Sequence, residues 1–161
     1  MIVVSLMAKV RASLRVLISI ALTCGSVPVF AVEIVDDRGV SVLLDAPARR
    51  VVTLAPHLTE ILFHIGGGDQ LVGVMDHSDF PAAAQSLPRV GTHSRLDIET
   101  ILALKPDLIV GWESGNPTED IALLERLGLP VFISEPRTLA DIGTLMRRLG
   151  ILVGKPEFAG Q

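Results

Sequence analysis

The sequence predicts an α/β fold, a three-layer lobe with a largely parallel sheet that is preceded by a β-hairpin. Two observations support this. Short apolar, β-branched runs alternate along the chain with segments whose apolar residues recur at helical spacing, which is typical of a parallel sheet covered by helices. The chain of 161 residues is also 49% hydrophobic, so it can bury a continuous core and is not expected to be disordered.

Residues 32–48 are expected to form the hairpin. Two apolar runs flank an Asp-Asp-Arg-Gly segment, and the turn is predicted at Asp37–Gly39 because Asp and Gly tolerate turn conformations. Pro47 ends this segment, so the α/β lobe is expected to begin at residue 49.

Four buried strands are expected in the lobe, because continuous apolar runs are typical of parallel strands covered on both faces. These runs lie at residues 51–54, 71–75, 108–110 and 131–133. Residues that favour the start of a helix occur after each of these runs. We expect helices to begin with the following first or capping residues: Pro56, Asp79, Asp97, Asn116 and Thr138.

Helical spacing predicts which side chains of these helices are buried. In the helix after Asp97 we expect a buried stripe that includes Leu102, and in the helix after Asn116 a stripe that includes Leu127. The last helix is expected to be capped within residues 138–141 and to bury Ile142, Leu145, Leu149 and Leu152.

Residues 1–31 have the layout of a secretory signal peptide. Three basic residues precede the apolar run 16–23, and Val29 and Ala31 are small residues suited to a cleavage site, with the cut after Ala31. A transmembrane anchor is the alternative, but the apolar run is short for a bilayer. Cys24 leaves lipidation open, although Thr23 stands where a smaller residue is usual.

Removal of this leader changes the composition. Of the 14 basic residues three lie in the leader, which leaves 11 against 18 acidic residues, and the only cysteine is lost with it. A thiol nucleophile, a disulfide framework and a thiolate metal site are then excluded. No basic stripe is present, so a nucleic-acid partner is not expected.

Candidate binding residues follow the ends of the predicted strands. Pro56 and His57 follow the first strand, His77 the second and Trp112 the third, while His93 follows a Val-Gly pair. Ligands of open parallel sheets bind beyond the carboxyl ends of the strands, so we expect these residues to share one rim. Trp112 is the residue expected to contact the ligand, because its large flat side chain suits a flat ligand.

A direct metal-ion site is one alternative for these histidines. His57, His77 and His93 could converge on an ion, with Glu113 or Asp79 as a carboxylate ligand. No local histidine pair anchors such a site. The fourth histidine, His64, lies inside a predicted helix, where we expect a structural or surface role.

An exported α/β enzyme is a further alternative, and the sequence gives it little support. No glycine-rich loop joins a strand to a helix, and no Gly-x-Ser-x-Gly nucleophile elbow is present. Asp76, His77 and Ser78 are adjacent, but a catalytic triad needs a geometry that adjacency does not supply. We therefore expect no enzymatic activity.

Several motifs occur in a fixed order over nearly all of residues 49–153. They are RRVVTLAPHLTE at 49–60, LVGV at 71–74, SDFP at 78–81, LPRVG at 87–91, LDIE at 96–99, ALKPDLIV at 103–110 and LGLPV at 127–131. In this order they resemble the metal-chelate class of periplasmic solute-binding proteins of ABC importers, which includes cobalamin, haem and ferric-siderophore receptors. The motifs SDFP and WESGN (112–116) are most similar to the cobalamin-binding branch.

The resemblance implies a set of expectations about function. The chain would bind a metal chelate, and the expected chelate is cobalamin or another corrinoid. This chelate would be a transported ligand and not a cofactor. The alternative ligands are haem, a ferric siderophore and a metal ion. Trp112 matches an aromatic position of the cleft, whereas His77 and His93 stand where Tyr and Trp are usual. Glu99, in the LDIE motif, would dock against the importer permease.

The resemblance also implies an architecture and a location. Residues 49–138 would be the N-terminal lobe of a two-lobed periplasmic monomer, and 139–161 the start of a long helix that joins the lobes. The second lobe is absent, so half of the cleft would be missing and weak binding is expected. Contact with the membrane would occur only through the transporter.

Overall fold

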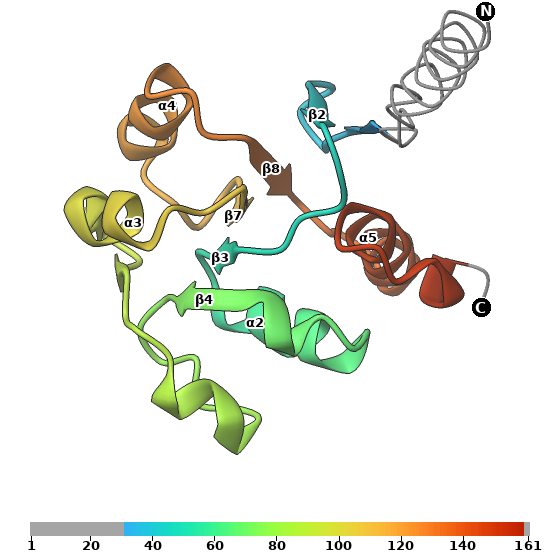
Figure 1. Ribbon diagram of the computed structural model, residues 1–161, viewed down its shortest axis with the longest axis horizontal. Helices are drawn as coiled ribbons and strands as arrows, with labels where there is room; N and C mark the ends of the chain where they lie inside the picture. Colours follow the sequence, from blue (N-terminus) through green and yellow to red (C-terminus); the bar gives the residue numbers. More distant parts are fainter. Residues whose placement is uncertain (1–30, 160–161) are drawn as a thin grey trace, which may run out of the picture.

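The computed structural model describes residues 31–159 and contains the predicted parallel sheet (Figure 1). Its strands lie in the order β4–β3–β7–β8, and every neighbouring pair is parallel. The strands are β3 (Val51–Thr53), β4 (Leu71–Val74), β7 (Leu108–Trp112) and β8 (Val131–Ser134). The α/β fold with a parallel sheet is therefore confirmed.

Helices cover both faces of this sheet (Figure 1). Helices α2 (Pro56–His64) and α5 (Leu139–Leu152) pack on one face, and α3 (Ile98–Leu104) and α4 (Thr118–Arg126) on the other. Short 3-10 helices complete the connections: η1 (Gly68–Gln70), η2 (Ala82–Ser86) and η3 (Pro156–Ala159). No described helix has the length and apolar character needed to cross a membrane.

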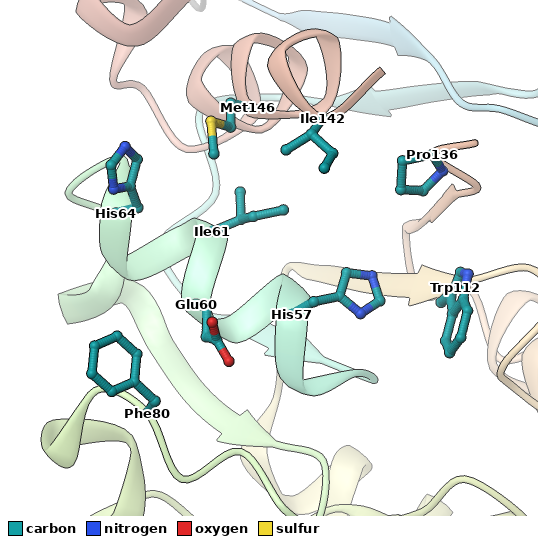
Figure 2. A pocket seen from close by; sticks show the side chains of 9 residues that line it. All are labelled: His57, Glu60, Ile61, His64, Phe80, Trp112, Pro136, Ile142 and Met146. Atoms are coloured by element: carbon teal, nitrogen blue, oxygen red, sulfur yellow. The ribbon is translucent and has the colours of Figure 1, made fainter. Parts of the chain in front are cut away.

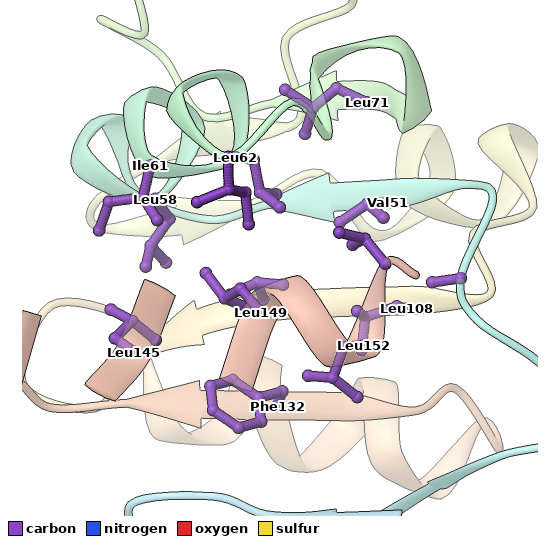
Figure 3. Close-up of a cluster of buried hydrophobic side chains, with 14 of the residues drawn as sticks. Val51, Leu58, Ile61, Leu62, Leu71, Leu108, Phe132, Leu145, Leu149 and Leu152 are labelled. Atoms are coloured by element: carbon purple, nitrogen blue, oxygen red, sulfur yellow. The ribbon is translucent and has the colours of Figure 1, made fainter. Parts of the chain in front are cut away.

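The strand residues alternate between two cores, because successive side chains of a strand point to opposite faces. Val51 and Phe132 pack with Leu58, Leu62, Leu145 and Leu149 on the α2–α5 side (Figure 3), whereas Val52 and Ile133 pack with Ile101 and Leu124 on the α3–α4 side. Burial of each such Leu or Ile stabilises the fold by about 1.5–3 kcal/mol. These two cores fix the strand ends, and therefore the carboxyl edge of the sheet.

The N-terminal hairpin forms as expected, from β1 (Val32–Val35) and β2 (Ser41–Leu44) in antiparallel register. Gly39 adopts a φ of +80° in the turn, which disfavours residues with a Cβ. The turn is fastened to β8: the Asp37 amide donates to the Ile133 carbonyl at 3.0 Å, and the Asp36 carboxylate accepts from the Ile133 amide at 3.3 Å. Arg38 completes this anchor with ion pairs of 2.8 Å to Asp36 and Glu125.

Two of the predicted helix starts are wrong. Asp79 does not cap a helix: its backbone carbonyl accepts from Gln85, its carboxylate pairs with Arg89, and only the 3-10 helix η2 follows. Asn116 is not a cap either, because Pro117 precedes α4 and the amide of Asn116 bonds to the strand ends instead. The starts at Asp97 and Thr138 are confirmed by their side-chain capping bonds.

Two side chains expected in buried stripes are exposed. Leu102 is 40% and Leu127 49% accessible, because α3 ends at Leu104 and α4 at Arg126 and these residues lie beside the helix ends, away from the sheet. The continuous helix expected over 139–161 is also wrong. Helix α5 ends at Leu152, Gly154 takes a φ of +70°, and the apolar face of α5 belongs to the core of the lobe. The expected lobe boundary at residue 138 stays a prediction.

The predicted signal peptide, its cleavage site and Cys24 involve residues 1–30, which lie outside the described residues.

Candidate functional site

The carboxyl ends of the parallel strands define one edge of the sheet. Residues 88–91 run parallel to β4 on its outer side: the Val74 amide donates to Pro88, and the Val90 amide donates back to Val74, both at 3.0 Å. The turn of the small hairpin β5 (Gly91–Thr92) and β6 (Arg95–Leu96) continues from this segment and contains His93. Across the edge the order is therefore His93, His77, His57 and Trp112.

A groove of about 520 Å³ lies at this edge, and we call it the edge groove (Figure 2). Helix α2 contributes four of its residues and α5 two, and single residues come from the loop after β4, the end of β7 and the loop after β8. The lining consists of His57, Glu60, Ile61, His64, Phe80, Trp112, Pro136, Ile142 and Met146. It combines aromatic and aliphatic surface with few polar groups, as is typical of a small-molecule site.

His57 and Trp112 are in direct contact in the groove. Their ring centroids lie 5.2 Å apart and their planes meet at 88°, an edge-to-face arrangement. Trp112 is the last residue of β7, where alternation turns its side chain away from the sheet core, and 36% of it is exposed. Gly115 gives the indole its space, because a Cβ there would lie 2.0 Å from Cε3 of Trp112.

Burial changes the protonation of His57. It lowers the pKa of the imidazole below the ordinary value of 6.5, because the charged form loses solvation, and the nearby carboxylates of Glu60 and Glu135 oppose this shift only in part. Among the described residues, Nε2 of His57 is buried and has no hydrogen-bond partner. The side chain is therefore a neutral, partly unsatisfied imidazole held against an indole.

Asn116 ties together the two strand ends that carry this pair. Its Nδ2 donates to the carbonyl of Leu54 and its Oδ1 accepts from the amide of Trp112, both at 2.7 Å. Asn116 is buried, so both bonds are shielded from water. The spacing of the His57 turn and Trp112 is thereby set by one side chain.

The loop after β4, which carries His77 and Phe80, is held from two sides. The hydroxyl of Ser78 joins a buried cluster with Thr59 and Thr53, with oxygen separations of 3.2 and 2.7 Å. From outside, Arg89 donates to the carbonyl of Ser78 at 3.0 Å. Phe80 is 69% exposed at the rim of the groove, where an apolar ligand could cover it.

The structure thus brings together only part of the predicted set. His57 and Trp112 line the edge groove, and Pro56 begins the helix that carries His57. His77, with a φ of +64°, and His93 are exposed and lie outside the groove lining. His64 is exposed, in line with a surface position, yet it also lines the groove.

The proposed metal ligands do not converge. Within residues 31–159, no group of three or more His, Cys, Asp and Glu side chains could hold a metal ion. His57 is in contact with Trp112, Asp79 pairs with Arg89, and Glu113 is exposed. The metal-ion alternative therefore has no geometric support in this part of the chain.

Several lining residues were missed, although the sequence contained a signal for most of them. His57, Glu60, Ile61 and His64 recur at intervals of three and four, which places them on one face of α2. Phe80 follows the same strand as His77. Pro136, Ile142 and Met146 had no comparable signal, because they reach the groove only through the packing of α5 beside α2.

Glu99 lies on the other side of the sheet, in the first turn of α3. Asp97 caps this helix, accepting from the Thr100 amide at 3.0 Å and from its hydroxyl at 2.8 Å, and these bonds lower the pKa of Asp97. Glu99 is exposed, and a negative charge in the first turn interacts favourably with the helix dipole. The carboxylate is accessible to a partner.

Comparison with known proteins now defines the family. The family described as Periplasmic binding protein matches residues 51–160. The chain belongs to the periplasmic binding protein family. A relative is the vitamin B12-binding protein of Vibrio cholerae serotype O1, which is 44% identical over 111 residues, covering 69% of this chain and 40% of that protein.

Solved structures of other periplasmic binding proteins share the fold. The periplasmic vitamin B12 binding protein BtuF of Vibrio cholerae gives a TM-score of 0.60 at 40% identity, covering 70% of this chain and 48% of that one. The periplasmic heme-binding protein RhuT from Roseiflexus sp. RS-1 gives a TM-score of 0.63 at 33% identity, covering 69% and 43%. The chain spans about two fifths of the length of the curated relatives it matches.

Proposed function

We propose that this chain forms the ligand-capturing lobe of a periplasmic protein that binds a corrinoid and delivers it to the permease of an ABC importer. The edge groove carries this proposal: Trp112, His57 and Phe80 present aromatic surface around a volume of about 520 Å³. Flat aromatic side chains suit the face of a large macrocycle. The similarity to proteins named for vitamin B12 binding supports the same ligand class.

Haem is the second candidate, because a heme-binding protein is 33% identical to this chain. A porphyrin is also flat and metal-bearing, so the aromatic surface alone does not separate it from a corrin. In this proposal the chelate is cargo, and the protein carries out no chemistry on it. We propose a monomer that meets the membrane only through its transporter, with a cleaved leader that ends at Ala31.

The exposed loop histidines have a secondary role in this proposal. His77 and His93 follow the same edge of the sheet, two and three strand positions from Trp112, which corresponds to about 10 and 14 Å. A ligand that extends from the edge groove across the edge would reach them. Glu99, on α3, is the proposed contact with basic residues of the permease.

Direct titration tests the function. Cyanocobalamin, haemin, a ferric siderophore and Zn²⁺ are each titrated into the protein, and we expect saturable one-to-one binding of the corrinoid. Trp112→Ala should weaken that binding by about tenfold or more, since loss of a stacked aromatic side chain removes about 1.5 kcal/mol. Leu139→Ala is the matched control, because Leu139 is 88% exposed and lies outside the groove. Preference for haemin or for Zn²⁺ would overturn the corrinoid assignment.

A further inference from the structure

The edge groove has an uneven charge. Glu60 is its one charged lining residue, and no Lys or Arg lines it among the described residues. Figure 2 shows the carboxylate of Glu60 between the rings of His57 and Phe80 in this view. Glu60 is exposed, and no hydrogen bond or ion pair engages its carboxylate within residues 31–159.

A second carboxylate adds to this negative field. Glu135 follows β8 and immediately precedes the lining residue Pro136, and its charge acts on His57 together with that of Glu60. Its position is fixed, because its amide donates to Asp37 at 2.7 Å and its carboxylate accepts from the Ser114 amide at 3.1 Å. The charges of two carboxylates therefore act on His57, the imidazole of the aromatic pair.

None of the guanidinium groups of the described residues lines the groove. Arg148 of α5 bonds to Asp37, Arg147 donates to the hydroxyl of Thr144, and Arg89 is held by the loop after β4. Arg137 follows Pro136 and is exposed, but it does not line the groove. The charge that a ligand meets inside the groove is thus negative.

The candidate chelates differ in the charge of their peripheral groups, and the negative charge of the groove can distinguish them. Corrinoids of the cobalamin type carry primary amides around the ring, whereas haem carries carboxylates. A carboxylate accepts strong hydrogen bonds from amide N–H groups and repels other carboxylates. We propose that Glu60 is a specificity-determining residue, whose unpaired carboxylate selects a chelate with amide donors at its rim and rejects one with carboxylates there. This inference rests on the proposed function and narrows its ligand class.

Two corrinoids with the same macrocycle test this proposal. Dicyanocobinamide carries peripheral amides, and dicyano-cobyrinic acid carries carboxylates in their place. Equilibrium dialysis against the protein, read by corrin absorbance, measures both affinities even when they are weak. We expect the protein to prefer the amide form by about fivefold or more, the value of one charge-assisted hydrogen bond at an exposed site, and the preference to shrink in high salt.

Variants at position 60 test whether the charge of Glu60 causes the preference for the amide-bearing corrinoid. Glu60→Gln should reduce the preference to near onefold, and Glu60→Lys should reverse it, while circular dichroism shows an unchanged fold. Glu119→Gln is the control, because Glu119 is also an exposed helical carboxylate but lies on α4, outside the groove. Equal binding of the two corrinoids, or an unchanged preference in Glu60→Gln, would overturn the role of Glu60 alone. Failure to bind either corrinoid would instead overturn the proposed function, and this inference with it.

Discussion

The imidazole of His57 meets the indole of Trp112 edge to face, with ring centroids 5.2 Å apart. Trp112 is the only tryptophan of the chain, and the chain has no tyrosine. The fluorescence of the protein therefore reports on this one contact. It gives a direct way to follow the edge groove without a ligand.

Fluorescence should fall on acidification. Burial lowers the pKa of His57, so the imidazole becomes protonated only below its ordinary value of 6.5, and a protonated imidazole quenches an excited indole in contact with it. We expect a quenching transition with its midpoint below pH 6.5, which His57→Gln abolishes. A midpoint at or above 6.5, or a transition that survives in His57→Gln, would contradict the contact or its burial.

The stability of the protein should depend on the protonation of the same imidazole, that of His57. In the unfolded chain the imidazole of His57 is protonated near pH 6.5, and in the folded protein only at lower pH. The contribution of this group to the free energy of unfolding is therefore greatest above pH 6.5 and decreases as the pH falls below that value. Urea unfolding at pH 7.5 and 5.0 measures the loss. His57→Phe should reduce the difference between the two pH values, whereas a substitution at an exposed residue without a titratable group, Leu139→Ala, should not.

Gly115→Ala should displace the indole. The new Cβ would lie 2.0 Å from Cε3 of Trp112, so the ring must move, and its pH-dependent quenching by His57 should weaken. The cost should be about 1 kcal/mol, because the ring is partly exposed and can relax. Gly143→Ala is the control: its Cβ would meet only Arg147 at 3.6 Å, and both stability and quenching should persist. Quenching that is undiminished in Gly115→Ala would show that the ring has not moved.

Asn116→Asp should loosen the strand ends. The new oxygen would face the Leu54 carbonyl in place of a donor, which leaves a buried repulsive contact and should cost about 2–3 kcal/mol at pH 7. Protonation of the introduced carboxyl restores a donor, so the deficit relative to the natural protein should narrow at pH 4.5. Chemical unfolding of both proteins at the two pH values checks this. A deficit that is independent of pH would argue against the bond to Leu54.

Glu99→Arg should separate folding from delivery. Glu99 is exposed, so the change should alter the free energy of unfolding by less than about 0.5–1 kcal/mol. Charge reversal at a docking contact replaces attraction by repulsion, so uptake in a transport assay should fall by more than it does in Glu99→Gln, with ligand affinity unchanged. Normal uptake with Glu99→Arg would rule out the docking role.

Much of the fold could be predicted because its strands are continuous apolar runs, and these coincide with β3, β4, β7 and β8. The errors arose where a residue type suits more than one role. Asn116 has the chemistry of a helix cap, but its amide is used between two strands that are distant in sequence. Asp79 likewise bonds to Arg89, a partner that no local pattern indicates.

The candidate site was predictable to a similar extent. The edge followed from strand order, and His57 and Trp112 were named from it. Which residues converge there depends on packing: α5 brings Ile142 and Met146 to the groove, and the conformations of two loops leave His77 and His93 outside it. Helical spacing along α2 identifies Glu60 as a neighbour of His57. Only the structure shows that the described lining contains no Lys or Arg, so that the charge of Glu60 is not balanced within the groove.

The anchor of the N-terminal hairpin has a consequence for the order of assembly. Asp36 lies 97 residues before Ile133, and Arg38 lies 87 residues before Glu125, so the first segment of the lobe acquires its partners almost last. Closing such a long loop carries a large entropy cost and slows folding. A chain that emerges from its N-terminus therefore stays open until β8 has appeared. For a protein exported through a cleaved leader, as proposed here, that delay keeps the N-terminal segment without its folded partners while the next 97 residues are made.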